Sequence, residues 1–298
     1  MECTIITFSD PGNPGAPPKD MGLLCKGYKH REVLFAKNNE KLWWLHNFFI
    51  FLQKVLTTII SPMTYITLPT NETRQLSFYL AMEEYVAKYV DEPDCFFMWQ
   101  VAPTVIFGRN QVVENEVNLA YCRDHDIRVV RRKSGGGCVY ADMDNLMLSM
   151  ITDGDNVGFI FNRFVTMIQL VLHRMGIEAT STAHNDIMIG DRKVCGTAFY
   201  QLPGRSIVHS TMLYDTNMTH MLNAITPGPE KLEKKGIQSV RQRITLLKEH
   251  THLQLEEVKQ LIRDTLCDGE RMLTAEQVAA IEEIEQKYLK QDFIHLIQ

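Results

Sequence analysis

Three consecutive glycines, Gly135-Gly136-Gly137, restrict the structure of this chain more than any other feature, and they follow Arg131, Arg132 and Ser134. A loop without Cβ atoms can close its backbone N–H groups around a bulky anion. The two arginines supply planar donors suited to phosphate or carboxylate. The segment is neither a Walker A motif nor a dinucleotide-binding fingerprint. It predicts an anion-binding loop, with a glycine-rich turn flanked by solvated arginines as the alternative.

A second polar segment, residues 185–198, predicts a β-hairpin that turns at Gly190-Asp191. Facing strands would bring Asp186 and Lys193 to one pocket. The Lys193 ammonium could neutralise a carboxylate and then the acyl-phosphate formed from it. Carboxylate oxygens suit Mg²⁺, so Asp186 is the candidate metal ligand. An exposed charged hairpin is the alternative interpretation.

Two further segments carry polar residues in strand-like surroundings. His209 follows Gly204-Arg205 in a predicted strand, where it is either a structural histidine or the wall of a substrate pocket. Arginines alternate along residues 235–244 and could reach phosphate or an acidic partner. An exposed edge strand protected by its charges is the alternative for that segment.

Composition indicates an ordinary globular protein. The 298 residues are 45% hydrophobic and 22% charged, enough for a substantial core in one large or two modest domains. A net charge of −5 argues against sequence-independent nucleic-acid binding, which needs a basic face. The seven cysteines are widely spaced without a Cys-x-x-Cys pair, which argues against a zinc site and a disulfide framework. We therefore expect a reducing, cytoplasmic location.

The N-terminal region, residues 1–62, differs from the rest. Residues 10–19 are rich in Pro and Gly and predict a loop. Residues 42–60 are apolar and long enough to cross a bilayer, but His46, Asn47, Gln53 and Lys54 interrupt them. We expect a packed or interfacial helix rather than a membrane span. Since the apparent domain begins after Met63, an alternative is that Met63 is the natural start.

Hydrophobic periodicity predicts an α+β fold with a largely antiparallel sheet and flanking helices. We assign residues 63–247 to one domain and residues 248–298 to closing helices. Thr274 and Gln277 fit a capping box. Strands are expected at 65–68, 95–100, 104–107, 128–131, 146–151, 186–189, 193–199 and 206–213, and helices at 76–90, 119–126, 159–175, 254–265 and 274–289.

Four ordered motifs between Tyr65 and Leu247 resemble the lipoate–protein ligase A family, relatives of the biotin protein ligases. They are Gly108-Arg109-Asn110-Gln111, the Arg131–Gly137 loop, the Asn185–Ala198 hairpin and Gly236–Ile244. The resemblance implies a biotin/lipoate-ligase-like catalytic domain that uses ATP, Mg²⁺ and lipoate. Its expected product is lipoyl-AMP, whose acyl group passes to a lysine of a lipoyl domain in a 2-oxoacid dehydrogenase or of the glycine-cleavage H protein.

The resemblance also implies roles for particular residues. Lys193 would be the central catalytic lysine, and Asp186 would lie near the phosphates and metal. Arg132 and the glycine loop would line the lipoyl and adenylate tunnel. The full set expected to bind substrate or adenylate is Arg131, Arg132, Ser134, Gly135, Gly136, Gly137, Asn185, Asp186, Gly196, Thr197, Ala198 and His209.

Three departures from the family pattern keep alternatives open. Residues 141–145 read Ala-Asp-Met-Asp-Asn where the family has His-Asp-x-Gly-Asn, and cysteines occupy positions 138 and 195. Residues 248–298 leave little room for the family's C-terminal accessory domain, so we expect that domain to be absent and adenylation to need a partner chain or preformed lipoyl-AMP. The alternatives are an octanoyl or lipoyl transferase acting without ATP, through Cys138 or Cys195, and a non-catalytic homologue that binds lipoyl domains.

Overall fold

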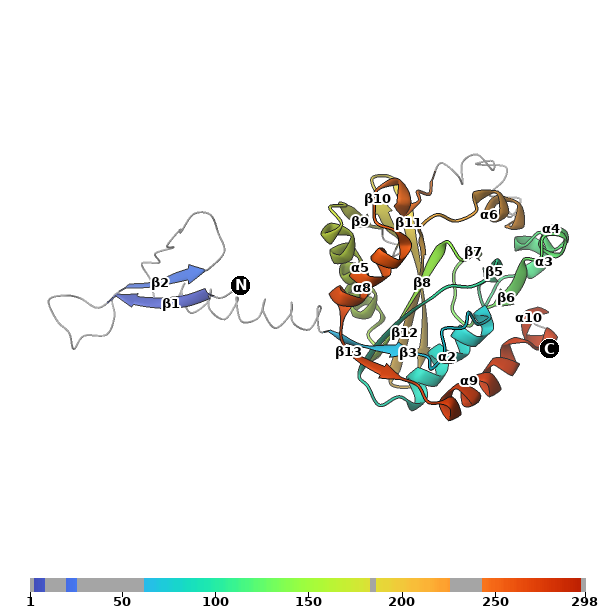
Figure 1. Cartoon of the computed structure of the whole chain (residues 1–298), viewed down its shortest axis with the longest axis horizontal. Coiled ribbons are helices and arrows are strands. Elements are labelled where there is room, and N and C mark those ends of the chain that lie inside the picture. The colour runs from blue at the N-terminus through green and yellow to red at the C-terminus, as the bar shows by residue number, and fades with distance from the viewer. Residues whose placement is uncertain (1–2, 9–19, 26–61, 183–185, 226–242, 296–298) are drawn as a thin grey trace. The chain divides into compact units, whose positions relative to one another are not determined.

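The computed structural model describes residues 3–8, 20–25, 62–182, 186–225 and 243–295 (Figure 1). The chain divides into two compact units, residues 1–59 and 60–298. In the first unit, β1 (Cys3–Phe8) pairs antiparallel with β2 (Asp20–Cys25). The expected loop at 10–19 and the apolar segment 42–60 lie outside the described residues. All further elements belong to the second unit.

The second unit is built on a sheet whose eight described strands follow the order β13-β3-β4-β8-β12-β11-β10-β9. The pairs from β4 through to β9 are antiparallel, whereas β13, β3 and β4 run parallel. The prediction of a largely antiparallel sheet is therefore confirmed. The bounds are β3 (Met63–Thr67), β4 (Asp94–Trp99), β8 (Asn145–Asp153), β9 (Ala179–Ser181), β10 (Ile187–Ile189), β11 (Arg192–Leu202), β12 (Arg205–Leu213) and β13 (Cys267–Met272).

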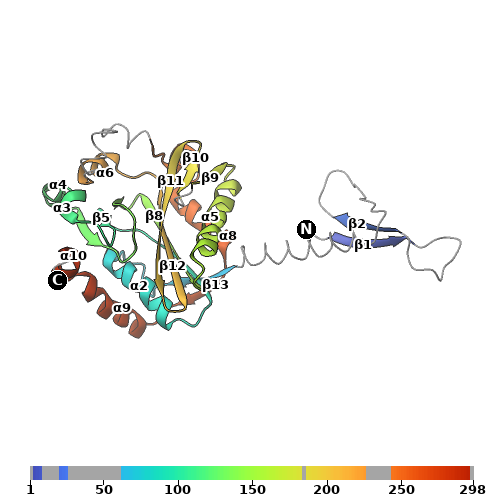
Figure 2. The same ribbon diagram turned by 180° about the vertical axis from the view of Figure 1, so that it is seen from behind.

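A small second sheet carries the segment that leads into the glycine loop. Its order is β6-β5-β7, with β5 (Thr104–Phe107) parallel to β6 (Arg128–Arg131) and antiparallel to β7 (Val139–Ala141). The glycine loop connects β6 to β7. Short helices α3 (Val113–Glu116), α4 (Leu119–Asp124) and α6 (Met218–Ala224) lie beside this sheet (Figures 1 and 2).

Helices cover both faces of the large sheet (Figures 1 and 2). On one face, α5 (Val157–Arg174) and α8 (Leu255–Leu266) pack on alternate residues of β4, β8 and β12 such as Phe96 and Val208. On the other, α2 (Leu76–Tyr89) is buried between the sheet and α9 (Ala275–Tyr288). This double burial explains why α2 is buried from Leu76 to Ala87 instead of along one stripe. Two short helices, η1 (Leu247–Glu249) and α10 (Gln291–His295), complete the unit.

Most local predictions are confirmed, and the differences are non-local. Gly176 ends α5 with φ +78°, and the Thr274–Gln277 capping box forms at the start of α9. Residues 248–298 were expected to contribute helices, but β13 also joins the large sheet beside β3. That strand, CDGERM, lacks a regular alternation of apolar residues, and its pairing partner β3 lies about 200 residues earlier in the chain.

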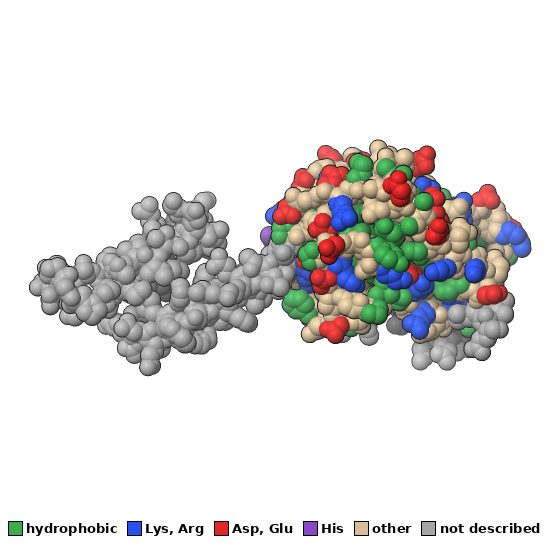
Figure 3. Space-filling model, turned by 90° about the horizontal axis from the view of Figure 1, so that it is seen from below, with side chains coloured by type: hydrophobic (Ala, Val, Ile, Leu, Met, Phe, Trp, Pro, Cys, Tyr) green, Lys and Arg blue, Asp and Glu red, His purple; other side chains and the backbone are tan. Residues whose placement is uncertain are grey.

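The face of the molecule seen in Figure 3 carries acidic and basic side chains interspersed around small apolar patches. Among the described helices, none is both long and apolar enough to cross a bilayer.

A buried ion pair joins α5 to the large sheet. Arg163 Nη1 and Nη2 lie 2.8 and 2.9 Å from the two carboxylate oxygens of Asp94. Arg163 is 6% exposed, and the pair is bidentate, the strongest geometry for such a contact. Thr152 of β8 also donates to Asp94. The pair therefore fixes α5 against β4 and β8.

We expect Arg163→Met to lower the free energy of unfolding by about 3 kcal/mol, because it leaves the Asp94 carboxylate without its partner. Denaturant titration measures this loss. Asp94→Asn in the same chain should restore part of it, since the unpaired charge is then removed. Losses that simply add in the double variant would contradict this account of the pair.

Candidate active site

One cavity of about 240 Å³ lies between the large sheet, the small sheet and α2. Its wall includes Lys193 and two residues of the glycine triplet, Gly136 and Gly137. The ammonium and the Cβ-free loop therefore meet around one space. The lining comprises Leu80, Trp99, Ile106, Arg132, Gly136, Gly137, Cys138, Val139, Met147, Asp186, Lys193, Gly196, Thr197, Ala198, His209, Ser210 and Thr211.

The glycine loop is held in a conformation that side chains would obstruct. Gly136 has φ +92°, in the left-handed region, and a Cβ there would lie 2.9 Å from Arg132 Nη2. A Cβ on Gly108 would lie 2.1 Å from the carbonyl oxygen of Gly136. Gly135 and Gly137 have open space where a Cβ would be. Glycine is therefore required at positions 108 and 136. The 108–111 segment and the glycine loop lie against each other at these two residues.

Arg132 organises the loop from within. Its Nη2 donates to the carbonyl oxygens of Gly135 and Gly137 at 2.7 and 2.8 Å, and its Nε donates to Gly135 at 3.2 Å. The side chain is 4% exposed, and burial lowers the pKa of its guanidinium to about 10. It is still charged at neutral pH. Arg132 thus places a positive charge in the cavity wall while it fixes the loop.

Arg131 lies elsewhere. Its Nη1 donates to the carbonyl oxygens of Arg109 and Gln111, both at 2.8 Å, and its Nη2 donates to Ile294 of α10 at 2.7 Å. The guanidinium also lies 4.4 Å from the Phe107 ring centroid. Arg131 was expected to bind substrate, but it is not among the residues that line the cavity. It anchors the 108–111 loop instead.

The hairpin brings Lys193 and Asp186 together. Lys193 Nζ lies 2.8 Å from Asp186 Oδ1, and both side chains are about one-third exposed. A register shift in the β10–β11 pairing lies beside Lys193, opposite Ile187/Met188. A Cβ on Gly196 would lie 2.7 Å from Lys193 Nζ. The ammonium can occupy this place only because residue 196 is glycine.

The backbone of Lys193 is fixed by a distant segment. Its N–H donates to Arg243 O at 2.8 Å, and its carbonyl accepts from Thr245 N at 2.9 Å. The pairing of β11 with β12 ends at Cys195, and Ile244 takes the place of β12 beside Lys193. The rest of the expected 235–244 motif, residues 235–242, lies outside the described part of the chain, as does Asn185.

Ser134 and His209 belong to a buried chain of hydrogen bonds. Ser134 Oγ lies 2.7 Å from His209 Nε2, and His209 Nδ1 lies 2.9 Å from Glu83 Oε2. Both ring nitrogens are therefore occupied, so His209 presents its carbon atoms to the cavity. Sequence analysis did not identify Glu83. The signal was available, since Glu83-Glu84 interrupts an otherwise apolar helix.

Glu84 holds the residue before Ser134. Its carboxylate accepts from Lys133 Nζ and from Tyr288 OH of α9, and Lys88 lies 3.3 Å away. Burial alone would raise the pKa of Glu84, but the hydrogen bonds from Lys133 and Tyr288 outweigh it, so the pKa is lowered. Tyr288 thereby links α9 to the glycine loop.

The altered segment at 141–145 forms a structural turn. Asp142 Oδ2 accepts from Asn217 N at 2.9 Å and from Thr216 Oγ1 at 3.1 Å. Asn145 donates to Tyr140 O and to Thr216 Oγ1. These bonds join the β7–β8 turn to the start of α6. The two positions shared with the family pattern therefore stabilise the turn that follows the glycine loop.

Both cysteines considered as nucleophiles lie near the cavity. Cys195 is completely buried, and burial raises the pKa of its thiol to about 12. A thiol with so high a pKa is a poor nucleophile. Cys138 is half-buried and lines the cavity.

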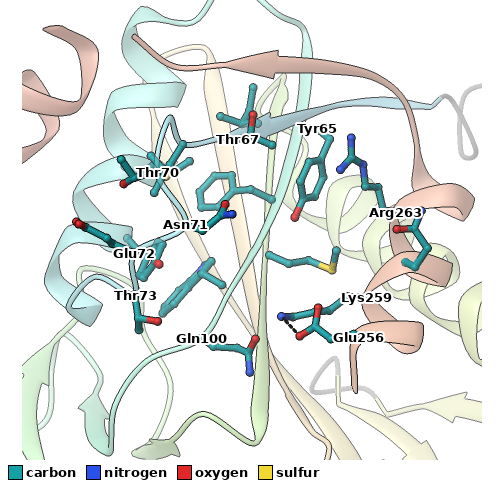
Figure 4. Close-up of a pocket in the computed structure, with 18 residues that line it drawn as sticks. Tyr65, Thr67, Thr70, Asn71, Glu72, Thr73, Gln100, Glu256, Lys259 and Arg263 are labelled. Carbon is teal, nitrogen blue, oxygen red and sulfur yellow. Dashed lines mark hydrogen bonds and ion pairs between the residues drawn. The ribbon is translucent and has the colours of Figure 1, made fainter. Parts of the chain in front are cut away.

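A larger cavity, of about 530 Å³, lies where β3 and β4 diverge beside α8 (Figure 4). Tyr65, Asn71 and Gln100 are among the polar side chains drawn around it, and its charged groups include Lys259, which pairs with Glu256. It contains none of the glycine-loop or hairpin residues. We therefore place the site in the smaller cavity, where the motifs converge.

The cavity offers one carboxylate, that of Asp186, as a candidate metal ligand. In the part of the chain that the structure describes, no group of three or more His, Cys, Asp and Glu side chains could hold an ion. Asp186 is one carboxylate at the cavity, and Mg²⁺ in nucleotide sites is commonly held by one or two carboxylates together with phosphates. The residues present fit that arrangement.

Comparison with known proteins assigns the chain to a family. Residues 75–267 match the family described as the lipoyl protein ligase A/B catalytic domain, and the chain belongs to it. Lipoate–protein ligase 1 of Staphylococcus aureus is 39% identical over 191 residues, which cover 63% of this chain and 58% of that protein. The chain spans about half the length of the curated relatives it matches.

Solved structures share the fold. A chain of the bi-partite lipoate protein ligase of Thermoplasma acidophilum has a TM-score of 0.68 and 25% identity, over 80% of this chain and 98% of that chain. A structure of lipoate–protein ligase A bound with ATP also has a TM-score of 0.68, at 23% identity, over 79% of this chain and 100% of that chain. The expected biotin/lipoate-ligase-like fold is confirmed through these lipoate ligases.

Gly136→Ala should destabilise the protein by about 1–2 kcal/mol, the cost of a left-handed backbone in a residue with a Cβ, and it should displace Arg132. Gly135→Ala is the matched control. Its Cβ meets open space, so its unfolding free energy should equal or exceed that of the wild type. Denaturant titration compares the two variants, and equal losses would contradict the described loop geometry.

Glu84→Gln should destabilise the protein most at neutral pH. Because the folded pKa of Glu84 lies below its ordinary value of 4.5, the carboxylate stabilises the fold above that pH. This stabilisation is lost as the pH falls through the folded pKa. The difference in unfolding free energy between wild type and variant should therefore shrink below about pH 4.5. A difference that does not change with pH would disprove the pairing.

Proposed function

We propose that this protein is an ATP-dependent lipoate–protein ligase. One observation carries the proposal: the ammonium of Lys193, the guanidinium of Arg132 and the glycine loop all line a single cavity. Membership in the lipoyl protein ligase A/B family and the lipoate ligases among its relatives support the same activity.

The residues that line the cavity match the two parts of a carboxylic acid with an apolar tail. Leu80, Trp99, Ile106, Val139 and Met147 provide apolar walls. Lys193 and Arg132 provide positive charge. A carboxylate would therefore lie near the two cations with its hydrocarbon among the apolar residues, because each part meets a matching environment.

The proposed reaction has two steps. A carboxylate oxygen of lipoate attacks the α-phosphorus of ATP, which forms lipoyl-AMP and releases pyrophosphate. A lysine amine of the acceptor then attacks the acyl carbon, which forms an amide and releases AMP. Lys193 and Arg132 would stabilise the negative charge that develops on the reacting oxygens. Asp186 would hold Mg²⁺, which supplies charge neutralisation on the phosphates.

Acceptors would be lipoyl domains of 2-oxoacid dehydrogenases and the glycine-cleavage H protein. A separate accessory chain is also part of the proposal. A chain of a ligase described as bi-partite shares this fold, and this likeness supports a second chain as a partner.

The second candidate is an acyl transferase that works without ATP through a cysteine thioester. Cys138 lines the cavity and is its best nucleophile, since burial disfavours the Cys195 thiolate. A non-catalytic lipoyl-domain-binding homologue is the remaining alternative. If lipoylation of a lipoyl domain requires ATP, the protein is the ligase and neither the ATP-independent transferase nor the non-catalytic homologue.

Lys193→Ala should lower the rate of lipoyl transfer by about 100-fold or more, as expected for loss of an electrostatic group at the reacting oxygens. The assay supplies preformed lipoyl-AMP and a lipoyl domain, so that it does not depend on an accessory chain, and mass spectrometry detects the modified lysine. Lys259→Ala, in the larger cavity, is the matched control and should retain full activity. Full activity in Lys193→Ala would refute the assignment.

A further inference from the structure

A single buried carboxylate, that of Glu83, accepts hydrogen bonds from two directions. Glu83 is 3% exposed and lies on α2, behind the cavity. His209 Nδ1 approaches Oε2 at 2.9 Å, and Ser149 Oγ approaches Oε1 at 2.6 Å. Each of these partners leads to a different wall of the cavity.

The first path reaches the glycine loop. His209 Nε2 lies 2.7 Å from Ser134 Oγ, and the Ser134 carbonyl accepts from Arg109 N at 2.9 Å. Ser134 directly precedes the glycine triplet. Glu83 therefore fixes the start of the loop through a single imidazole.

The second path reaches the apolar wall. Trp99 Nε1 donates to Ser149 Oγ at 2.9 Å, and Trp99 lines the cavity next to Met147. The Trp99 ring also stacks on Tyr79, with centroids 4.8 Å apart, and it forms part of the wall of the larger cavity as well. Glu83 thus fixes the orientation of the indole between the two cavities.

The carboxylate also sets the direction of the hydrogen bonds next to it. A carboxylate only accepts, so Nδ1 of His209 carries a proton, and where that is the only ring proton Nε2 accepts from the Ser134 hydroxyl. The Ser149 hydroxyl donates to Glu83 and accepts from Trp99. The donors next to Glu83 therefore point toward one carboxylate.

The Ser134–His209–Glu83 arrangement resembles a nucleophilic triad in its order, but its surroundings exclude that role. Ser134 is 1% exposed, and the space it shares with His209 and Glu83 measures about 10 Å³. An acyl carbonyl does not fit there, since about that volume is needed for one water. The chain is a support for the cavity and not a reacting group.

We propose that Glu83 is a positioning residue that couples the two ends of the cavity, holding the glycine loop through His209 and the apolar wall through Ser149. This inference rests on the proposed function, in which the reacting carboxylate and phosphate lie near the cations and the glycine loop while the hydrocarbon lies among the apolar residues. It predicts that loss of one charge on α2 weakens binding at both ends, although Glu83 itself contacts neither ligand.

Glu83→Gln is the decisive variant because it preserves the size of the side chain. The amide has one acceptor oxygen, so it cannot accept from both His209 and Ser149 in the native geometry. If the oxygen stays with Ser149, the amide NH₂ faces His209, whose proton must then move from Nδ1 to Nε2. Ser134→Ala and Ser149→Ala each interrupt one path and leave the other intact. Glu285→Gln makes the same change at a carboxylate that accepts from one serine of α2, Ser77, and is the matched control.

Two measurements test the proposal. ¹⁵N NMR of histidine-labelled protein reports which nitrogen of His209 carries the proton. Calorimetry reports affinity for ATP with Mg²⁺ and for lipoate, while thermal unfolding verifies that each variant is folded. If the free energy of one lost hydrogen bond to a charged group appears in full as lost binding free energy, the affinity falls by about tenfold or more.

The expected results are specific to each variant. Glu83→Gln should weaken both ligands about tenfold, and the His209 proton should move to Nε2 where the amide oxygen stays with Ser149. Ser134→Ala and Ser149→Ala, which each interrupt one path, should each weaken binding less than Glu83→Gln does, and Glu285→Gln should match the wild type in both assays. The double variant Glu83→Gln/Ser134→Ala should bind ATP no more weakly than Glu83→Gln.

Contradictory results are equally distinct. Unchanged affinity for either ligand in a folded Glu83→Gln would overturn the coupling. Should Glu83→Gln fail to fold, the Ser134→Ala and Ser149→Ala pair decides, because wild-type affinity for both ligands in either of them would also overturn it. Wild-type protein that binds neither ligand would refute the proposed function instead, and a wild-type His209 without a proton on Nδ1 would still overturn the role of Glu83 in the relay.

Discussion

The site depends on close backbone approaches that only glycine permits. Gly108 lies against the Gly136 carbonyl, Gly136 lies against the Arg132 guanidinium, and Gly196 lies against the Lys193 ammonium. In each pair, a Cβ would occupy the space that a cation or a carbonyl now fills. The glycines therefore do more than supply flexibility, because they bring positive charge and loop backbone to the same cavity.

Polar groups packed this deeply would be costly unless each had a partner. The four residues 131–134 meet this requirement through different parts of the fold. Arg131 donates to carbonyls of the 108–111 loop and α10, Arg132 to the glycine loop itself, and Lys133 to Glu84. Ser134 shares a hydrogen bond with His209. The C-terminal helices α9 and α10 thus take part in the support of the loop, far from it in sequence.

Sequence predicts the features that depend on residues close together in the chain, and it misses those that depend on distant ones. The hairpin at 186–199 and the helix that Gly176 ends were predictable because turn residues and short-range periodicity specify them. The meeting of Lys193 with the glycine loop was implied by the family resemblance, and the structure places both at one cavity. Adjacent arginines look alike in sequence, but in the structure Arg132 lines the cavity whereas Arg131 donates to the carbonyl of Ile294 and does not line it. Glu83 and β13 were missed because their partners lie on strands distant in the chain.

The most direct test is a crystal structure of the protein with a non-hydrolysable sulfamoyl analogue of lipoyl-AMP. The account predicts that the analogue occupies the smaller cavity, with its sulfamoyl linkage within hydrogen-bonding distance of Lys193 Nζ and its lipoyl chain beside Trp99. An analogue bound in the larger cavity beside α8, with Lys193 directed away from it, would contradict the account.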